Sequence, residues 1–261
     1  MPRRNLSGAR TIVTGASSGI GRELCFQLCQ RGADVLATAR REDRLVELVQ
    51  RCSGLPGSIY FIAGDLTDNS HRRAIADSVQ CRWTALDVLI NNAGAGAIGR
   101  FDGASSDRLR KVMEIDFFAP VELTRICLSL LEQGRRPAIL NIGSVLSHRA
   151  VPNKSEYCAA KFAMRGWSES LRVELARKHI EVLMLSPSTT QSEFLDSLVD
   201  TKASEKSKAI GIMSAERVAE LAISALVRSK REMILSLGGK ALVWAGRLFP
   251  RLTDRVLGRF A

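Results

Sequence analysis

The chain alternates short apolar runs with longer amphipathic segments, and this alternation constrains its fold more than any other feature. Buried strands of a parallel sheet are apolar on both faces. Runs of this character lie at residues 11–13, 34–38, 58–62, 86–90, 138–142 and 181–185. The segments between them have the apolar spacing of helices. These lie at residues 22–31, 41–51, 70–81, 106–132 and 155–178.

This order predicts an α/β fold: a single Rossmann-like, doubly wound parallel sheet with helices on both faces. A helix at residues 214–229 and a further run at 232–236 bring the expected sheet to about seven strands. We expect the domain to cover residues 1–238. It includes a polar substrate loop at 187–211, for which disorder is the alternative. Residues 239–261 are interpreted as a basic amphipathic tail.

Composition excludes several classes of protein. Hydrophobic residues make up 46% of the chain, which is enough for a sizeable core and excludes disorder of the whole chain. No apolar run is long enough for a transmembrane helix, and the basic start lacks the apolar stretch of a secretory signal peptide. The cysteines form no CxxC pair and no zinc-ligand spacing. We therefore expect a cytoplasmic protein with reduced thiols and no metal.

The net charge of +11 favours an anionic partner. A phosphorylated cofactor, an acidic membrane surface and nucleic acid all fit, and a solvated basic surface is the alternative. No nucleic-acid-binding motif accompanies the charge, so we expect no nucleic-acid partner. The tail either contacts the inner face of a membrane peripherally or packs on the domain or on a second subunit.

A glycine-rich loop, TGASSGIG at residues 14–21, follows the first apolar run and opens a helix. Glycines permit a tight turn and let the backbone approach a pyrophosphate at the helix N-terminus. The spacing is GxxxGxG rather than GxGxxG, so the loop alone also fits a ligand-free turn. Its candidate cofactor contacts are Gly15, Ser17, Ser18, Gly19, Ile20 and Gly21.

Two further motifs follow later strands. Asn92, Ala93 and Gly94 come after the fourth run, where small residues let a flat ligand lie close; alone they also fit a strand-ending turn. Tyr157 and Lys161 are four residues apart, so they share one helix face. The unperturbed pKa of tyrosine is about 10, and a nearby ammonium lowers it by favouring the phenolate. Ser144 follows the fifth run and is placed to reach the same crevice.

Taken together and in this order, the three motifs resemble the short-chain dehydrogenase/reductase family over residues 11–236. The resemblance implies a nicotinamide cofactor and hydride transfer between a carbonyl and an alcohol. It implies that Tyr157 is the acid and base, that Lys161 lowers its pKa and holds the ribose, and that Ser144 orients the carbonyl. Further cofactor contacts are implied at Asp65, Leu66, Pro187, Ser188 and Thr190. A homodimer or homotetramer through the fourth and fifth helices is also implied.

The charge of the residues after the second strand indicates which cofactor the chain prefers. NAD enzymes usually carry a carboxylate after the second strand, against the ribose 2′-hydroxyl. Here Arg40 and Arg41 stand at that place, and a guanidinium suits a 2′-phosphate. NADP(H) is therefore favoured over NAD(H), with a solvated helix start as the alternative interpretation of the arginines. Ser18 stands where some NADP-dependent relatives have a basic residue.

Three positions depart from the family pattern. Asp116 replaces an asparagine of the catalytic set, where it either strengthens the charged state of Lys161 or competes for that lysine. Ser188 replaces a glycine after the sixth strand, and Ser192 replaces a threonine.

The expected substrate is a small hydrophobic carbonyl or alcohol, such as a keto lipid, a steroid-like or retinoid-like carbonyl, or a 3-oxoacyl thioester. The expected pocket residues are Val145, Leu146, His148, Val151 and Phe194. The alternative function is a cofactor-binding scaffold or sensor with little turnover.

Overall fold

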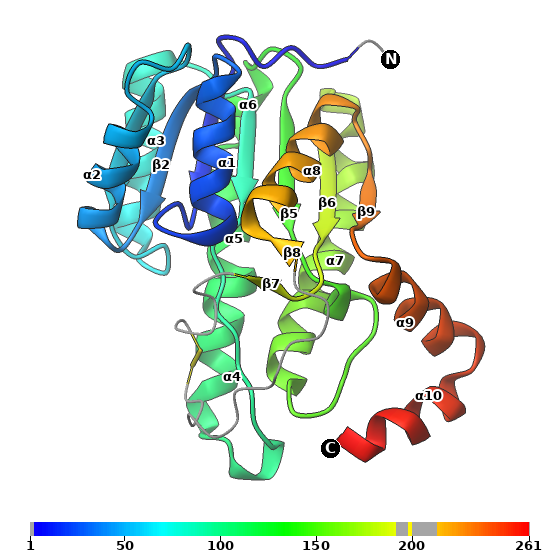
Figure 1. Cartoon of the computed structure of the whole chain (residues 1–261). Helices are drawn as coiled ribbons and strands as arrows, with labels where there is room; N and C mark the ends of the chain where they lie inside the picture. Colours follow the sequence, from blue (N-terminus) through cyan, green and yellow to red (C-terminus); the bar gives the residue numbers. More distant parts are fainter. Residues whose placement is uncertain (1–2, 192–197, 200–212, 261) are drawn as a thin grey trace.

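A sheet of seven parallel strands runs through the computed structural model, which describes residues 3–191, 198–199 and 213–260 (Figure 1). Its strands are β1 (Arg10–Thr14), β2 (Asp34–Ala39), β3 (Ile59–Ala63), β4 (Val88–Asn91), β5 (Ala138–Ile142), β6 (Glu181–Ser186) and β9 (Glu232–Ile234). They lie in the order β3-β2-β1-β4-β5-β6-β9. Every neighbouring pair is parallel. The predicted doubly wound sheet is confirmed.

Helices cover both faces of this sheet. On one face lie α1 (Gly19–Gln30), α2 (Glu42–Arg51) and α8 (Ala215–Val227). On the other lie α3 (Asn69–Trp83), α5 (Ala119–Ile126), α6 (Leu128–Glu132) and α7 (Ser155–Glu174). Side chains alternate between the faces along each strand: Val13 contributes to the first core and its neighbour Ile12 to the second. The apolar character of both faces, noted in the sequence, follows from this burial.

The helical segment expected at residues 106–132 is interrupted. It consists of α4 (Ser106–Met113), a π-helical turn (Glu114–Phe118), α5 and α6. Pro120, at the start of α5, has no backbone N–H to donate to the carbonyl of Asp116, so the regular helical ladder is broken there. Single π-turns of this kind recur at functional sites, and Asp116 lies at the centre of this one.

The C-terminal residues form two helices, α9 (Leu237–Leu248) and α10 (Pro250–Leu257), followed by a 3₁₀ turn (Gly258–Phe260). They leave the edge of the sheet after β9 and turn back below it (Figure 1). Arg149 pairs with Asp254 of α10, and Asn153 donates to the Phe260 carbonyl at 3.2 Å. Helix α9 starts two residues before the expected boundary of the tail, so the boundary falls inside a helix.

No helix in the described ranges is long and apolar enough to cross a membrane. Two short strands, β7 (Thr190–Gln191) and β8 (Met213–Ser214), pair in parallel beside the carboxyl edge of the main sheet. They lie at the start and just after the end of the expected substrate loop. Most of that loop, with Ser192 and Phe194, lies outside the described residues.

Candidate active site

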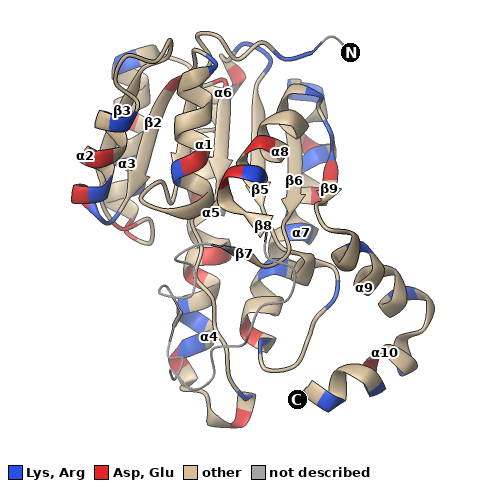
Figure 2. Cartoon of the chain, viewed as in Figure 1, with Lys and Arg blue, Asp and Glu red and all other residues tan. Residues whose placement is uncertain are grey.

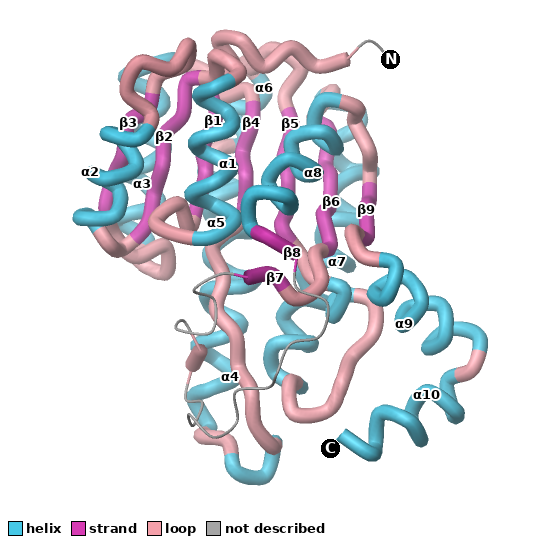
Figure 3. Tube along the Cα trace, in the orientation of Figure 1, coloured by secondary structure: helices cyan, strands magenta, loops and turns pink. Residues whose placement is uncertain are grey.

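A cavity of about 810 Å³ opens at the carboxyl ends of the strands, the edge that faces α4 and α9 in Figure 3. In such sheets a ligand usually binds at the carboxyl ends of the strands, at the point where the strand order reverses. Here β1 and β4 flank that point. Almost all expected contacts line this cavity. They are Gly15, Ser17, Ser18, Gly19, Ile20, Arg40, Arg41, Asp65, Leu66, Asn92, Ala93, Gly94, Ser144, Val145, Leu146, Val151, Tyr157, Lys161, Pro187, Ser188 and Thr190.

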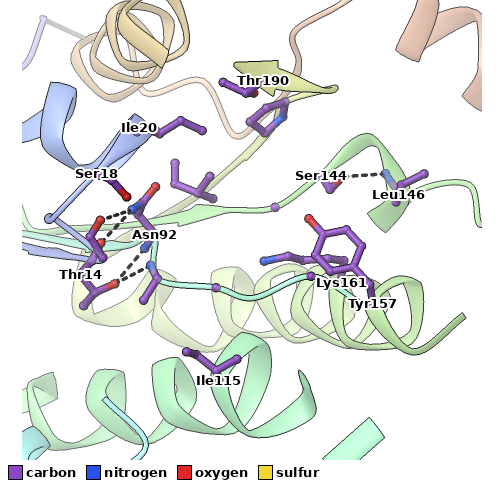
Figure 4. A pocket seen from close by; sticks show the side chains of 18 of the residues that line it. Thr14, Ser18, Ile20, Asn92, Ile115, Ser144, Leu146, Tyr157, Lys161 and Thr190 are labelled. Atoms are coloured by element: carbon purple, nitrogen blue, oxygen red, sulfur yellow. Dashed lines mark hydrogen bonds between the residues drawn. The ribbon is translucent and has the colours of Figure 1, made fainter. Parts of the chain in front are cut away.

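Thr14 joins the glycine loop to the end of β4 (Figure 4). Its hydroxyl accepts from the backbone N–H of Asn92 and of Ala93, both at 3.0 Å, while the Asn92 amide donates to the Thr14 carbonyl at 2.9 Å. These hydrogen bonds therefore hold the turns that follow β1 and β4 against each other. Gly15 there has φ +68, a left-handed conformation that favours glycine.

Two glycines keep neighbouring backbone and polar atoms close together. A Cβ on Gly21 would lie 2.2 Å from the Gly15 carbonyl oxygen, so a side chain there would break the turn; Gly21 shapes the loop without lining the cavity. A Cβ on Gly94 would lie 2.8 Å from Oδ1 of Asp116 and 3.4 Å from Nζ of Lys161. Because Gly94 has no side chain, the loop after β4 can lie close to Asp116 and Lys161.

Ser144, Tyr157 and Lys161 come together on one side of the cavity (Figure 4). Ser144 caps the short 3₁₀ turn Val145–Ser147, where its Oγ accepts from the Leu146 N–H at 3.1 Å. Tyr157 and Lys161 lie one turn apart on α7, and the Lys161 ammonium is 5.6 Å from the centre of the Tyr157 ring. The i, i+4 spacing thus brings them together as predicted.

Behind Lys161 lies Asp116, with one carboxylate oxygen 3.4 Å from the lysine Nζ. Asp116 is 1% exposed and Lys161 5%. The other oxygen, Oδ1, accepts from the Ala95 N–H at 2.7 Å. Asp116 contacts Lys161 and does not itself line the cavity. The π-turn aims its carboxylate at α7.

The ionisable groups of this cluster influence one another. Burial raises the pKa of Tyr157; the Lys161 charge opposes that rise, and the Asp116 charge adds to it. The lysine thus acts in the predicted direction without overcoming burial. Burial lowers the pKa of Lys161, but Asp116 and Tyr157 outweigh this effect, so its pKa is raised and the ammonium stays charged. Burial also raises the pKa of Asp116, partly offset by Lys161.

A polar network lies in the sheet beneath this cluster. The Asn91 amide of β4 donates to Asn141 of β5 at 2.8 Å and to Thr124 of α5 at 3.1 Å. Asn141 in turn donates to Ser168 of α7 at 2.8 Å. These four buried side chains connect the helix that follows Asp116 with the helix that carries Lys161.

The far end of the cavity holds the groups expected to select the cofactor. Asp65 accepts from the backbone N–H and the hydroxyl of Thr67, at 2.9 and 2.8 Å, which fixes the carboxylate beside the cavity. Arg41 donates to the Ser17 hydroxyl at 3.2 Å. Arg40 is exposed and lines the same wall, and no carboxylate in the described part of the chain forms an ion pair with it.

One expected pocket residue lies elsewhere. The ring of His148 is buried, with Nε2 at 2.9 Å from the Ser186 hydroxyl and 3.7 Å from the Glu232 carboxylate, and His148 does not line the cavity. The turn that caps at Ser144 directs this ring toward β6 and β9. Burial also lowers the pKa of His148, which disfavours its charged form.

Three residues of the C-terminal segment line the cavity without having been predicted from the sequence: Gly238, Gly239 and Leu242 of α9. Gly239 lies against the wall that holds Ser144, since a Cβ there would be 2.5 Å from Cγ2 of Val145. Two adjacent glycines just inside a helix indicate that another part of the backbone comes close to it, and this signal was present in the sequence. Among the described residues, no group of three His, Cys, Asp or Glu side chains is placed to hold a metal.

Comparison with known proteins gives consistent matches. The family model described as short chain dehydrogenase matches residues 9–203. The chain is 30% identical to an uncharacterized oxidoreductase, YxnA, of Bacillus subtilis, over 94% of this chain and 70% of that protein. It is 30% identical to a 3-ketodihydrosphingosine reductase of Bacteroides thetaiotaomicron, over 71% of this chain and 65% of that protein.

The fold also matches solved structures. A short chain dehydrogenase/reductase from Burkholderia phymatum, in complex with NAD, has a TM-score of 0.86 at 20% identity. The match covers 95% of this chain and 96% of that one. At this identity the likeness concerns the fold.

Proposed function

From the premise that the chain belongs to the short-chain dehydrogenase/reductase family, we propose that it is an NADP(H)-dependent oxidoreductase acting on a hydrophobic ketone or the matching alcohol. The observation that carries the proposal is the convergence of Ser144, Tyr157 and Lys161 on one wall of the cavity that the glycine loop also lines. A dinucleotide and a substrate carbonyl fit such an arrangement.

The residues present suit a nicotinamide dinucleotide. Gly15, Gly21 and Gly94 let the glycine loop, the end of β4 and the Asp116–Lys161 pair pack closely together, because a side chain at any of them would clash with protein atoms. The N-terminus of α1 opens at Ser18, whose side chain makes no capping bond, and such an end favours phosphate. Asp65 would contact the adenine end, and Lys161 the ribose next to the nicotinamide. The cofactor supplies or accepts the hydride.

The chain itself moves the proton. Tyr157 donates its phenolic proton to the carbonyl oxygen during reduction and takes it back from the alcohol during oxidation. Ser144 donates a hydrogen bond to the same oxygen and so orients the carbonyl. The Lys161 ammonium, whose pKa Asp116 raises, stabilises the phenolate that remains after the proton has left. Asp116 is a positioning residue that acts through Lys161.

The preference for NADP(H) is supported by Arg40 and Arg41 on the cavity wall beside Ser17. The side chains near Tyr157 support a hydrophobic substrate, because Ile98, Val145, Val151 and Leu242 line the cavity. A keto lipid is the class we favour, and one relative is named as a 3-ketodihydrosphingosine reductase.

We also propose that the protein forms a homodimer or homotetramer through α4, α5 and α7. Leu109 of α4 and Phe162 of α7 are large apolar side chains that are exposed, and so is Phe118, just before α5. Apolar side chains of this kind gather at subunit interfaces. Sedimentation velocity of the wild type against Phe162→Glu tests it: a smaller particle in the variant is expected, and an unchanged monomer in both contradicts it.

The test of the activity measures cofactor binding and turnover together. Cofactor fluorescence gives the Kd of NADPH and of NADH, and loss of NADPH absorbance gives turnover with a long-chain 3-ketone. We expect Tyr157→Phe to lower turnover about 10²- to 10⁴-fold while NADPH binding is kept. Wild-type binding of NADPH without turnover of any ketone in a panel would instead indicate a scaffold.

A separate pair of variants tests the cofactor preference. We expect Arg40→Ala to weaken NADPH binding about tenfold or more, through loss of a charge-assisted hydrogen bond, and to leave NADH binding unchanged. Arg44→Ala is the matched control, because this arginine lies in the first turn of α2, shortly after Arg40, and does not line the cavity. Equal effects of the two variants, or equal wild-type affinity for both cofactors, would reject the arginine argument.

A further inference from the structure

The C-terminal segment exposes an unusual amount of apolar surface. Half of the fourteen large apolar side chains that are exposed in the described chain lie in residues 237–260. They are Leu237, Trp244, Leu248, Phe249, Leu252, Val256 and Phe260. Leu248 is 63% exposed and Phe249 62%, although they stand next to each other where α9 meets α10. Apolar patches that persist on a folded surface mark contact with a partner or a membrane.

These side chains follow the helix period. Trp244 and Leu248 are four residues apart on α9, and Leu252 and Val256 are four apart on α10, so each pair forms a stripe on one helix face. The opposite side of α9 is buried through Gly239 and Val243. The apolar stripes therefore lie on the sides of the helices that the domain leaves uncovered.

Basic side chains accompany the stripes. Lys240, Arg247, Arg251, Arg255 and Arg259 are all exposed, and the helices that carry them appear with blue segments in Figure 2. Asp254 is the one acidic residue of this segment, and it forms an ion pair with Arg149. The segment from 237 to 260 thus combines an apolar face with a formal charge of +4, from five basic residues and one acidic residue.

This positive charge distinguishes between two partners that an exposed apolar face can bind, a second copy of the chain and a lipid surface. A second copy docked face to face would bring two equally basic surfaces together, and like charges at an interface oppose association. An anionic lipid surface satisfies both properties, because the apolar side chains enter the interfacial region while arginines and lysines reach the headgroups. We propose that α9 and α10 dock the protein on an anionic lipid bilayer, lying in its interface.

The docking surface is connected to the cavity. Gly238, Gly239 and Leu242 of α9 line the cavity, while Trp244 and Leu248 of the same helix belong to the exposed stripe. A bilayer held by α9 would therefore lie beside one wall of the site. The docking proposal stands without the proposed activity, because its readout is binding to lipid.

Vesicle sedimentation tests the proposal on the full chain. We expect binding to phosphatidylcholine vesicles that contain about 30% phosphatidylglycerol, weaker binding to pure phosphatidylcholine, and a decrease with added salt. The double variant Leu252→Glu/Val256→Glu should lose more than tenfold in affinity, and Arg251→Gln/Arg255→Gln about tenfold. Val173→Glu, an exposed apolar position on α7, should bind like the wild type.

Several results would overturn the proposal. They are absence of binding to the anionic vesicles, equal binding by wild type and the Leu252→Glu/Val256→Glu variant, or equal loss in the Val173→Glu control. A smaller particle for Leu252→Glu/Val256→Glu in sedimentation velocity, with vesicle binding unchanged, would assign the face to a second copy. Circular dichroism and NADPH binding check that each variant is folded.

The fluorescence of Trp244 provides an independent test of the docking proposal. Its emission should shift to the blue when anionic vesicles are added, because the ring moves from water into the interface. Trp244→Phe should abolish the shift while Trp83 and Trp167 still emit. A shift that persists in this variant comes from elsewhere in the protein and contradicts docking through α9.

Discussion

One carboxylate oxygen of Asp116 lies 3.4 Å from the Lys161 ammonium; both side chains are buried, and Lys161 lines the cavity wall that carries Tyr157 while Asp116 does not. The Asp116 carboxylate therefore lies among the side chains that influence the phenolic proton of Tyr157. The Asp116 charge raises the pKa of Tyr157, and the Lys161 charge lowers it. Asp116 thus favours the protonated phenol, the form that donates to a carbonyl during reduction.

Replacing Asp116 by Asn is expected to shift the pH dependence of alcohol oxidation. Without the negative charge, the pKa of Tyr157 falls, so the phenolate that accepts the proton forms at lower pH. The half-maximal point of kcat/KM for oxidation should therefore move to lower pH. Glu114→Gln, on the same turn, is the control. A profile that stays in place in Asp116→Asn contradicts the coupling.

Gly94→Ala is expected to reduce activity through crowding. The added methyl group would lie 2.8 Å from Oδ1 of Asp116 and 3.4 Å from Nζ of Lys161, so the Asp116 carboxylate must shift beside its ion-pair partner. Misplacing a reacting group by about 1 Å costs on the order of 10²-fold in rate. Steady-state kinetics measure this loss, and Gly103→Ala, where a Cβ has open space, should keep the wild-type rate. Similar rates in both variants would refute the crowding argument.

Gly239→Ala is expected to change substrate selection more than cofactor binding. Its Cβ would lie 2.5 Å from Val145, so α9 must move away from the turn that carries Ser144. We expect a KM change of several-fold for a bulky ketone, with an unchanged Kd for NADPH. Gly238→Ala is the adjacent control, because nothing lies within 4 Å of the added carbon. An equal KM change in both variants would contradict the role assigned to the close contact between Gly239 and Val145.

Glu156→Gln is expected to destabilise the fold by about 3–5 kcal/mol, since it leaves the buried charge of Arg108 without its partner. Arg108 donates to Glu156 at 2.7 and 2.9 Å, and the pair joins α4 to α7. Burial raises the pKa of Glu156, but the Arg108 hydrogen bonds outweigh it and the pKa is lowered.

The sign of its pH dependence follows from that shift. The stabilisation is present above the unfolded pKa of Glu156 and is lost as pH falls through the lower folded pKa. Urea denaturation should therefore show a difference between wild type and Glu156→Gln at neutral pH that shrinks in acid. Asp102→Asn, in an exposed ion pair, should change stability little. A difference that stays constant with pH would contradict this origin.

The strands, the glycine loop and the Tyr157–Lys161 pair were predictable because each depends on short-range pattern. The period of apolar residues determines which faces are buried, and a spacing of four determines which side chains share a helix face. The π-turn was not predicted, although Pro120 was visible, because proline at that place also fits the first turn of a new helix.

Other features depend on contacts between distant segments. The expected pocket position of His148 failed because its ring reaches Ser186, thirty-eight residues away. The approach of Gly239 to Val145 likewise joins segments that no local pattern connects. Residues 239–261 were interpreted as a tail separate from the domain, but α9 forms part of the cavity wall. This contact between distant segments also leaves no local pattern in the sequence.

The hydrogen-bonded set of Asn91, Thr124, Asn141 and Ser168 has a mechanical consequence. Asn91 and Asn141 are on neighbouring strands, and each bonds to a different helix, α5 or α7. The backbones of α5 and α7, the first following Asp116 and the second carrying Lys161, are therefore tied to two neighbouring strands. Any change that alters the distance between β4 and β5 would thus be passed to the two helices from which the proton-handling side chains extend.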